Sequence, residues 1–180
     1  MKLKSTLKAG HDPAGPENSE PARNHAECPS AKPGITRILV PTDYSPCSVR
    51  ALEHAVTLAN AFEATIILLH VVEPAISSIE SMTAPADREE QLQAHLNAER
   101  ERLVELHRKR IGPHVTGETL VRIGRAWSEI SDTAKALGAD LIVLGAQGAG
   151  CLRQSLLGST AEGVVRHARC PVLTVPQTAP

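Results

Sequence analysis

Short aliphatic runs alternate along the chain with longer segments whose apolar residues recur every three or four positions. The aliphatic runs occupy residues 36–41, 65–72, 115–123, 141–144 and 171–176. The segments with helical spacing occupy residues 48–62, 88–110, 128–137 and 159–168. Short runs rich in branched aliphatic residues are typical of buried strands, and helical spacing is typical of helices that bury one face. The pattern therefore predicts five strands alternating with four helices.

The second predicted helix is the most charged, yet it carries an apolar stripe. We expect a solvated outer face and a buried face formed by Leu92, His95 or Leu96, Leu103 and Leu106. The ends of two other helices are marked by single residues. Ser45 or Cys47 lies near the cap of the first helix, and Gly138 follows the third.

Alternating strands and helices predict an α/β protein with a mostly parallel, doubly wound sheet covered by helices on both faces. Right-handed crossovers are the strongly preferred way to join parallel strands. In such sheets ligands bind beyond the carboxyl ends of the strands, where the winding direction reverses. The loop after the first strand carries Asp43 and the loop after the fourth begins at Gly145, so we expect these two loops to meet there.

Residues 1–34 differ from the rest of the chain in composition and in the pattern of apolar residues. They contain five prolines and several charges without a periodic apolar pattern, so they cannot bury enough surface to offset the entropy of ordering. We expect a disordered N-terminal tail followed by a single domain over residues 35–177.

Charge and composition narrow the classes of partner and compartment. A net charge of −1 and an aromatic content of 2% give no basic field or stacking platform for nucleic acid or an anionic membrane. The four cysteines lie far apart without metal-ligand spacing, as expected of free thiols. No apolar run approaches the roughly 18 residues of a membrane helix, and the N-terminus lacks the apolar segment of a signal peptide. We therefore expect a cytoplasmic protein.

A glycine-rich stretch, GAQGAGCLRQSLLGST, follows the fourth predicted strand. Gly145, Gly148 and Gly150 can turn several N–H groups toward one concavity, and the later Gly-Ser-Thr opens a helix whose positive end suits a phosphate. The simpler alternative is a turn followed by an ordinary helix cap. Neither the Walker pattern GxxxxGK[ST] nor the dinucleotide fingerprint GxGxxG is present.

The spacing Gly145-x2-Gly148-x9-Gly158-Ser159 resembles the G-x2-G-x9-G-[S/T] motif of the universal stress protein family, in its ATP-binding branch. The resemblance extends over residues 36–176. It includes the segments ILVPTD at 38–43, LLHV at 68–71, LLGSTAE at 156–162 and CPVL at 170–173.

The resemblance implies a flavodoxin-like or Rossmann-like sheet of order 3-2-1-4-5, with ATP bound where the first and fourth strands part. It places Asp43 against the ribose or a Mg²⁺-linked phosphate and Val71 against the adenine. The remaining implied contacts are Pro41 and Thr42 for the nucleoside, Leu144, Gly145, Gln147 and Gly148 for ribose and phosphates, and Gly158, Ser159, Thr160 and Ala161 for the phosphate chain. It also implies a homodimer through the C-terminal strand.

Two positions depart from the family pattern. Many members carry a basic or imidazole side chain in the glycine loop, where this chain has Gln147 and Ala149, so Arg153 is the nearest cation in sequence. Neutralising a triphosphate then rests on backbone dipoles, Arg153 and a divalent ion. Ala161 lacks a hydroxyl group found in some members, and Thr160 beside it can substitute.

Several single residues have two interpretations. Asp43 is either a ligand contact or a turn former ahead of Pro46. Trp127 either borders the base pocket or, as we favour, packs in the first turn of its helix. His70 fits a hydrogen-bonded core histidine better than a catalyst. Cys151, in the glycine loop, is a candidate redox-sensitive thiol, whereas Cys170 fits a small core residue.

These features favour a nucleotide-binding stress-response or regulatory protein in which ATP occupancy changes conformation or the binding of a protein partner. A slow ATPase or phosphotransferase is one alternative, although the sequence offers no obvious catalytic base beside the loop and an efficient enzyme is not expected. The other alternative is a dimeric interaction module that binds no nucleotide and pairs through its edge strand at residues 172–175.

Overall fold

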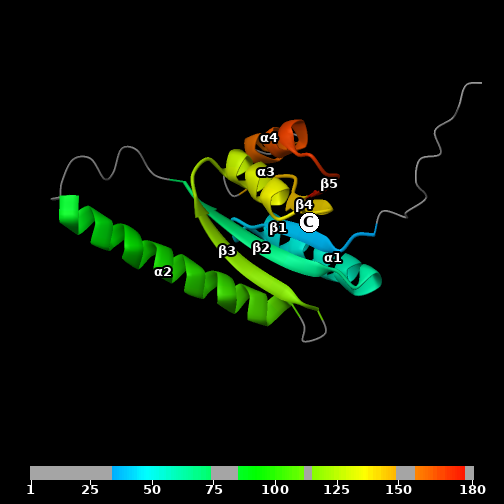
Figure 1. Ribbon diagram of the computed structural model, residues 1–180, viewed down its shortest axis with the longest axis horizontal. Coiled ribbons are helices and arrows are strands. Elements are labelled where there is room, and N and C mark those ends of the chain that lie inside the picture. The colour runs from blue at the N-terminus through cyan, green and yellow to red at the C-terminus, as the bar shows by residue number, and fades with distance from the viewer. Residues whose placement is uncertain (1–33, 74–84, 112–114, 149–156, 177–180) are drawn as a thin grey trace, which may run out of the picture. The chain divides into compact units, whose positions relative to one another are not determined.

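The computed structural model describes residues 34–73, 85–111, 115–148 and 157–176, with the side chains of residues 85–88 left out. Apart from Gly34, the expected tail therefore lies outside the described residues. The described chain forms a five-stranded parallel sheet of order β3-β2-β1-β4-β5 (Figure 1). Its strands are β1 (Arg37–Pro41), β2 (Thr65–Val72), β3 (Gly117–Ile123), β4 (Leu141–Gly145) and β5 (Val172–Val175).

Four helices alternate with these strands in the described chain: α1 (Pro46–Phe62), α2 (Pro85–Arg110), α3 (Ala126–Ala136) and α4 (Ser159–His167). The single-domain α/β class, the alternation and the strand order are therefore confirmed. The bounds of β2 match the prediction, whereas α3 begins two residues before the predicted 128 and α2 three residues before the predicted 88. No helix of the described ranges is both long enough and apolar enough to cross a bilayer.

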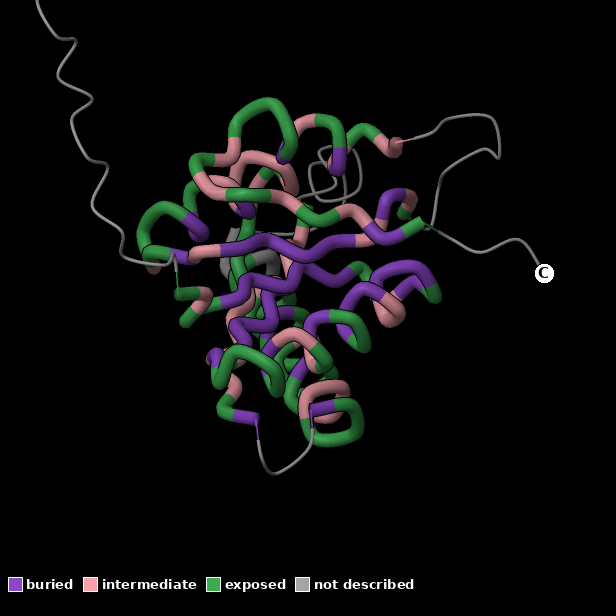
Figure 2. Tube along the Cα trace, turned by 90° about the vertical axis from the view of Figure 1, so that its right-hand side faces the viewer, coloured by how far each residue is buried: buried purple, intermediate pink, exposed green. Residues whose placement is uncertain are grey.

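The two faces of the sheet are covered by different helix pairs, and each face has its own hydrophobic core. Ile38 and Val40 of β1 pack with α1 and α2, whereas Leu39 between them packs with α3 and α4. This alternation follows from the two-residue period of a strand. Figure 1 shows α3 and α4 on one side of the sheet and α2 on the other, and Figure 2 shows burial concentrated in the strands.

The apolar stripe on α2 shows whether His95 or Leu96 faces the core. Leu96 and Leu103 are buried, and Leu92 and Leu106 are partly buried, as expected. His95 is exposed, so Leu96 rather than His95 belongs to the buried face. One residue of rotation on a helix separates the two positions by about 100°.

Local hydrogen bonds define the helix ends that were marked in the sequence. Ser45 is the N-cap of α1, and its hydroxyl accepts from the backbone N–H of Ser48 at 3.2 Å. Gly138 follows α3 with φ of 60°, and the N–H groups of Gly138 and Ala139 donate to carbonyls of the last helical turn. This paired bonding is a Schellman ending, in which glycine supplies the left-handed residue without strain.

Asp140 joins the amino ends of β1 and β4. Its carboxylate accepts hydrogen bonds from the N–H and hydroxyl of Thr36, both at 2.8 Å, and from the N–H of Arg37 at 2.9 Å. These donors hold the pKa of Asp140 below its ordinary value, with the Thr36 backbone bond as the largest cause. The first and fourth strands are therefore fixed together at one end, while they diverge at the other.

Candidate functional site

A cleft of about 1110 Å³ opens where the carboxyl ends of β1 and β4 part. Small-molecule sites commonly fall near this size, and this is the switch point where α/β sheets bind ligands. Every site residue proposed from the sequence except Arg153 lines it: Pro41, Thr42, Asp43, Val71, Leu144, Gly145, Gln147, Gly148, Gly158, Ser159, Thr160 and Ala161. Arg153 lies outside the described residues, as do Gly150, Cys151 and the rest of 149–156.

The loop between β1 and α1 is fixed by its own side chains. The hydroxyl of Thr42 accepts from the N–H of Tyr44 at 3.0 Å and contacts the hydroxyl of Ser48 at 3.1 Å, both in largely buried positions. Tyr44 lies in the left-handed region with φ of 61°, a conformation that tyrosine rarely adopts. Such backbone persists only where surrounding contacts over-determine it, so this wall of the cleft is rigidly specified.

Asp43 stabilises the loop between β1 and α1 and also lies close to Gly148 in the loop that follows β4. Its Oδ1 accepts from the N–H of Ser45 at 3.0 Å, which is the turn-forming bond expected of an aspartate here. Its Oδ2 lies near Gly148, because a Cβ added to that glycine would sit 2.9 Å from this oxygen. The turn interpretation is therefore correct, and the same carboxylate still lines the cleft.

Gly145 brings the end of β4 close to the start of α1. A Cβ at this position would lie 3.1 Å from the carbonyl carbon of Cys47 and from the backbone nitrogen of Ser48. Both are backbone atoms that cannot give way easily, so the close approach favours glycine. Gly145 therefore lets the end of β4 pack closely against the start of α1 beside the cleft.

The start of α4 forms the opposite wall. Gly158 is its N-cap, without a side-chain hydrogen bond to the helix, and its own N–H donates to the carbonyl of Ala146 at 2.8 Å. The next three residues, which begin the helix, all line the cleft. The first N–H groups of a helix lack intrahelical partners and carry the positive end of its dipole, so this wall suits an anion.

Sequence reasoning missed part of the lining. The additional described residues are Ser48, Leu69, His70, Val72, Glu73, His95, Ala126, Ile130, Ala146 and Leu157. Glu73 also accepts from the N–H of Ala126 at 2.7 Å and so caps α3. Side chains alternate across a strand, so residues on both faces at the end of β2 can reach the cleft. This alternation was the sequence signal that could have identified His70, and Glu73, which follows the strand directly, as lining residues.

Charge in the cleft is carried by few described groups. Asp43 and Glu73 are the carboxylates, His70 and His95 are the imidazoles, and no lysine or arginine is among the described lining residues. Residues placed in the structure also form no group of three or more potential metal-ligating side chains. A single carboxylate still fits Mg²⁺, which is typically held by one or two carboxylates together with substrate phosphates.

Trp127 lies outside the cleft and packs between α3 and α4. An added Cβ at Gly163 would lie 2.6 Å from Cγ of Trp127, so the indole rests directly on this glycine of α4. The indole also stacks on the His167 ring with centroids 4.5 Å apart. The favoured packing interpretation therefore agrees with the structure. Cys170 likewise packs at the edge of the core on this face.

Comparisons with known proteins identify the family. The model of the universal stress protein family matches residues 34–176. Universal stress protein MJ0531 from Methanocaldococcus jannaschii is 35% identical over 141 residues, which cover 77% of this chain and 81% of the relative. The solved structure of MJ0577 from the same organism has a TM-score of 0.69 and 27% identity, covering 82% of this chain and 99% of its own.

A further solved structure is a universal stress protein in complex with cAMP. It has a TM-score of 0.58 and 23% identity and covers 81% of this chain and 99% of its own, a likeness that shows the fold alone. The family match spans both walls of the cleft, and the strand order agrees with it. The chain belongs to the universal stress protein family.

Proposed function

We propose that the protein binds an adenine nucleotide, ATP with Mg²⁺ above all, in the cleft between β1 and β4. One observation carries the proposal: the start of α4, whose N-cap Gly158 supplies no side-chain hydrogen bond, and the glycine-rich end of β4 face Asp43 and the end of β2 across a single cleft. The arrangement provides an anion-binding wall, a carboxylate and an apolar wall in the order that a nucleotide presents phosphates, ribose and base.

Each part of the nucleotide has a matching surface in this proposal. Val71, with the backbone at Pro41 and Thr42, contacts the adenine and nucleoside. Asp43 binds a ribose hydroxyl or a phosphate-linked Mg²⁺, while Leu144, Gly145, Gln147 and Gly148 surround the ribose and phosphates. Gly158, Ser159, Thr160 and Ala161 hold the phosphate chain by backbone N–H groups and hydroxyls, with Arg153 as the nearest cation in sequence.

Regulation rather than catalysis is the proposed role. The two carboxylates among the described lining residues already accept backbone hydrogen bonds, Asp43 from Ser45 and Glu73 from Ala126. In this proposal Asp43 binds the ribose or Mg²⁺ and Glu73 caps α3, so neither carboxylate is assigned as a general base, and we propose at most slow ATP hydrolysis. A nucleotide bridging the two walls stabilises their closed arrangement and so changes the surface offered to a protein partner. The proposed compartment is the cytoplasm.

A homodimer through β5 belongs to the same proposal. β5 is an edge strand of the sheet, and its Leu173 is 40% exposed. Val165 on the neighbouring α4 is 49% exposed. An edge strand with exposed aliphatic side chains pairs readily with another chain. The dimer also suits the alternative of an interaction module, so only nucleotide binding separates the two functions.

A thermal-melt titration of the full chain tests the proposed ligand. A ligand that binds only the folded state raises Tm with concentration, so MgATP, ADP and AMP should each be titrated with and without EDTA. We expect MgATP to raise Tm more than ATP in EDTA, because Asp43 and the phosphates share the cation. The absence of any shift at millimolar nucleotide would refute the proposed function.

A further inference from the structure

Tyr44 is the residue around which the loop between β1 and α1 turns. The hydroxyl of Thr42 accepts a hydrogen bond from the Tyr44 N–H at 3.0 Å. Oδ1 of Asp43 accepts another from the N–H of Ser45, also at 3.0 Å. This second bond closes a turn whose middle residue is Tyr44, so the backbone angles of Tyr44 set the direction of the Asp43 carboxylate. The other carboxylate oxygen, Oδ2, is the one that lies near Gly148 across the cleft.

The backbone conformation of Tyr44 is unfavourable for a tyrosine. Its φ of 61° lies in the left-handed region, where the Cβ atom crowds the following carbonyl oxygen. Strain of this kind persists only where the surrounding contacts over-determine it. The contacts of the tyrosine side chain therefore bear on whether the loop keeps its shape.

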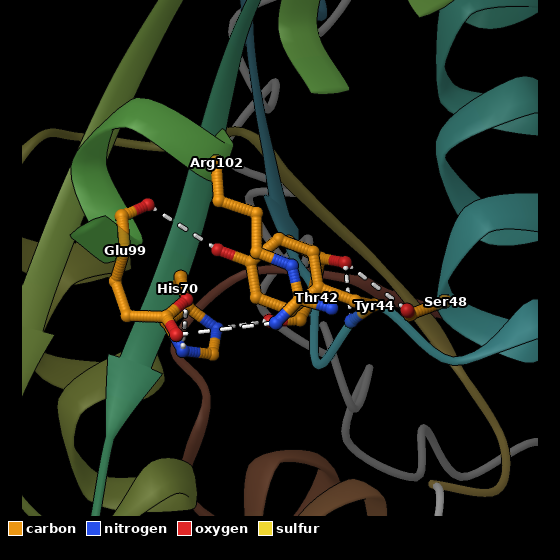
Figure 3. A network of polar contacts seen from close by, with 6 residues as sticks. All are labelled: Thr42, Tyr44, Ser48, His70, Glu99 and Arg102. Atoms are coloured by element: carbon orange, nitrogen blue, oxygen red, sulfur yellow. Dashed lines mark hydrogen bonds and ion pairs between the residues drawn. The ribbon is translucent and has the colours of Figure 1, made fainter. Parts of the chain in front are cut away.

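A cation on α2 covers the ring of Tyr44. The guanidinium carbon of Arg102 lies 3.8 Å from the ring centroid, and Figure 3 shows the Arg102 side chain reaching from α2 to the ring. A cation over an aromatic face is attracted by the quadrupole of the ring. Glu99, three positions earlier on α2, places Oε1 3.9 Å from the guanidinium of Arg102 and helps to orient it.

The other neighbours of Tyr44 come from α2 and β2. The Tyr44 hydroxyl donates a long hydrogen bond of 3.4 Å to the backbone carbonyl of Glu99. The ring centroid lies 4.7 Å from that of His70, whose Nδ1 lies 2.8 Å from the carbonyl oxygen of Thr42. Nε2 of His70 lies 3.6 Å from Oε2 of Glu99, a proximity without a hydrogen bond. The partly buried tyrosine thus packs between β2 and α2, with Arg102 as the charged group on its face.

We propose that Arg102 and Tyr44 are positioning residues for nucleotide binding: the guanidinium clamps the ring, and the clamped ring keeps the left-handed backbone that directs Asp43 into the cleft. Arg102 is not among the described residues that line the cleft, so its route to the ligand runs through the loop. Without the clamp the loop relaxes to other conformations, and the apparent affinity falls with the fraction that stays competent. The effect on affinity rests on the proposed function, whereas the clamp itself does not.

The exposure of Arg102 sets the size of the expected effect. Its side chain is 60% exposed, so water competes with the ring for the charge. A cation–π contact at an exposed site corresponds to about twofold to fivefold in an equilibrium constant. The strain at Tyr44 leaves the loop little reserve, so removal of the charge should lower the competent fraction by about this factor.

NMR of the unliganded full chain measures the loop conformation without nucleotide. Tyr44 is the only tyrosine of the chain, so ¹⁵N-tyrosine labelling gives a single backbone amide signal. A positive φ brings the amide proton close to the α-proton of the same residue, and this pair then gives a strong nuclear Overhauser effect. We expect a strong effect in wild type and in Arg102→Lys, which keeps a cation, and a weaker one in Arg102→Gln. An equally strong effect in all three proteins would overturn the inference whatever the nucleotide does.

Calorimetric titration with MgATP measures the consequence for binding. We expect Arg102→Gln to bind about twofold to fivefold more weakly than wild type, and Arg102→Lys to recover most of the affinity. Tyr44→Phe should bind like the wild type, because it keeps the aromatic face. Tyr44→Leu keeps an apolar side chain without that face, so it should bind at least as weakly as Arg102→Gln.

A double variant shows whether the clamp acts through Asp43. Residues that act in series are not additive, so Arg102→Gln should cause little further loss in an Asp43→Asn background. A merely structural effect of Arg102 would add to the loss from Asp43→Asn. Additive losses in the double variant, or equal affinities of wild type and Arg102→Gln, would overturn the positioning role.

Arg100→Gln is the matched control, since it removes the same charge from α2. Arg100 is exposed and donates a hydrogen bond to Asn97 of its own helix at 2.8 Å. The variant should bind MgATP like the wild type, and a loss equal to that of Arg102→Gln would reduce the effect to general charge and overturn the inference. Absence of nucleotide binding in every protein, with the NMR difference observed, would instead refute the proposed function and the effect on affinity while the clamp stands.

Discussion

The β1–β4 pair differs sharply between its two ends. At the amino end, Asp140 ties the strands together with three hydrogen bonds from Thr36 and Arg37. At the carboxyl end, the strands diverge into a cleft bordered by glycines, a helix start and the Asp43 loop. We call the amino end the closed end, because the Asp140 carboxylate holds the strands together there. We call the carboxyl end the open end, because there the strands border a cleft with backbone N–H donors. The contrast predicts that changes at the open end alter ligand binding and changes at the closed end alter stability.

The largest effect should follow from Gly158→Val at the start of α4. A Cβ there meets only ordinary contacts, the nearest 3.6 Å away at the carbonyl oxygen of Ala146, so the variant should fold. The added methyl groups occupy the space through which phosphate reaches the helix N–H groups. We expect MgATP affinity to fall at least about 100-fold, or about 2.7 kcal/mol. Unchanged calorimetric affinity in a folded variant would remove α4 from the site.

Gly148→Val provides a second test of the same wall from the other side. Its Cβ would lie 2.9 Å from Oδ2 of Asp43, the end of a side chain that can move. We expect weaker nucleotide binding with retained folding, as measured by calorimetry and circular dichroism. Full affinity in both glycine variants would contradict the proposed position of the phosphates.

Gly145→Ala should be an exception to the rule that changes at the open end alter ligand binding and changes at the closed end alter stability. It lies at the open end, but its Cβ would press on the backbone of Cys47 and Ser48 at 3.1 Å, so it should act on stability. Overpacking of this kind costs about 2 kcal/mol. Urea unfolding should show this loss, and Gly158→Ala, whose Cβ fits, is the matched control. Equal stability of the two variants would show that the approach of β4 to α1 is not tight.

Asp43→Asn separates the two roles of this residue. Asparagine keeps an oxygen that can accept from the N–H of Ser45, so the turn and the melting temperature should be preserved. Loss of the negative charge removes a partner for Mg²⁺, and we expect about tenfold weaker binding of MgATP. With EDTA present, calorimetry should find a smaller difference between the variants. Equal affinities in Mg²⁺ would show that the carboxylate only shapes the loop.

The smallest effect concerns the closed end. The pKa of Asp140 is lowered in the folded protein, so its contribution to stability is present above its ordinary pKa and is lost as the pH falls through the folded-state value. Allowing for solvent screening, Asp140→Asn should cost about 1 kcal/mol at neutral pH. It should also remove the part of the acid destabilisation that falls below about pH 4. Urea unfolding across this range checks both statements, and nucleotide affinity should not change.

Sequence periodicity was sufficient for the elements and their alternation, because each strand and helix buries a face set by local spacing, whereas the strand order followed from the family resemblance. The same reasoning placed the glycines and Asp43 together, since both follow parallel strands whose carboxyl ends share one edge. It did not find the contact between His70 and Glu99, which are far apart in sequence. Glu99 sits among many charged residues of α2, and no periodic signal distinguishes it from its solvated neighbours.

His95 illustrates a second limit of the sequence. Adjacent positions on a helix point in different directions, and the spacing allowed either His95 or Leu96 to face the core. In the structure Leu96 is buried, and His95 lines the cleft instead. Trp127 was predicted more securely, because a large aromatic ring in the first turn of a helix has few alternatives to packing.

Native mass spectrometry of the freshly purified full chain tests the central claim most directly. Wild-type protein and Gly158→Val should be prepared in parallel and sprayed with and without added MgATP. We predict one adenine nucleotide per chain in the wild type and none in the variant, with the same oligomeric state in both. Absence of nucleotide from the wild type even with added MgATP, or equal occupancy of the two proteins, would contradict a nucleotide site in the cleft between β1 and β4, with the start of α4 as its phosphate-binding wall.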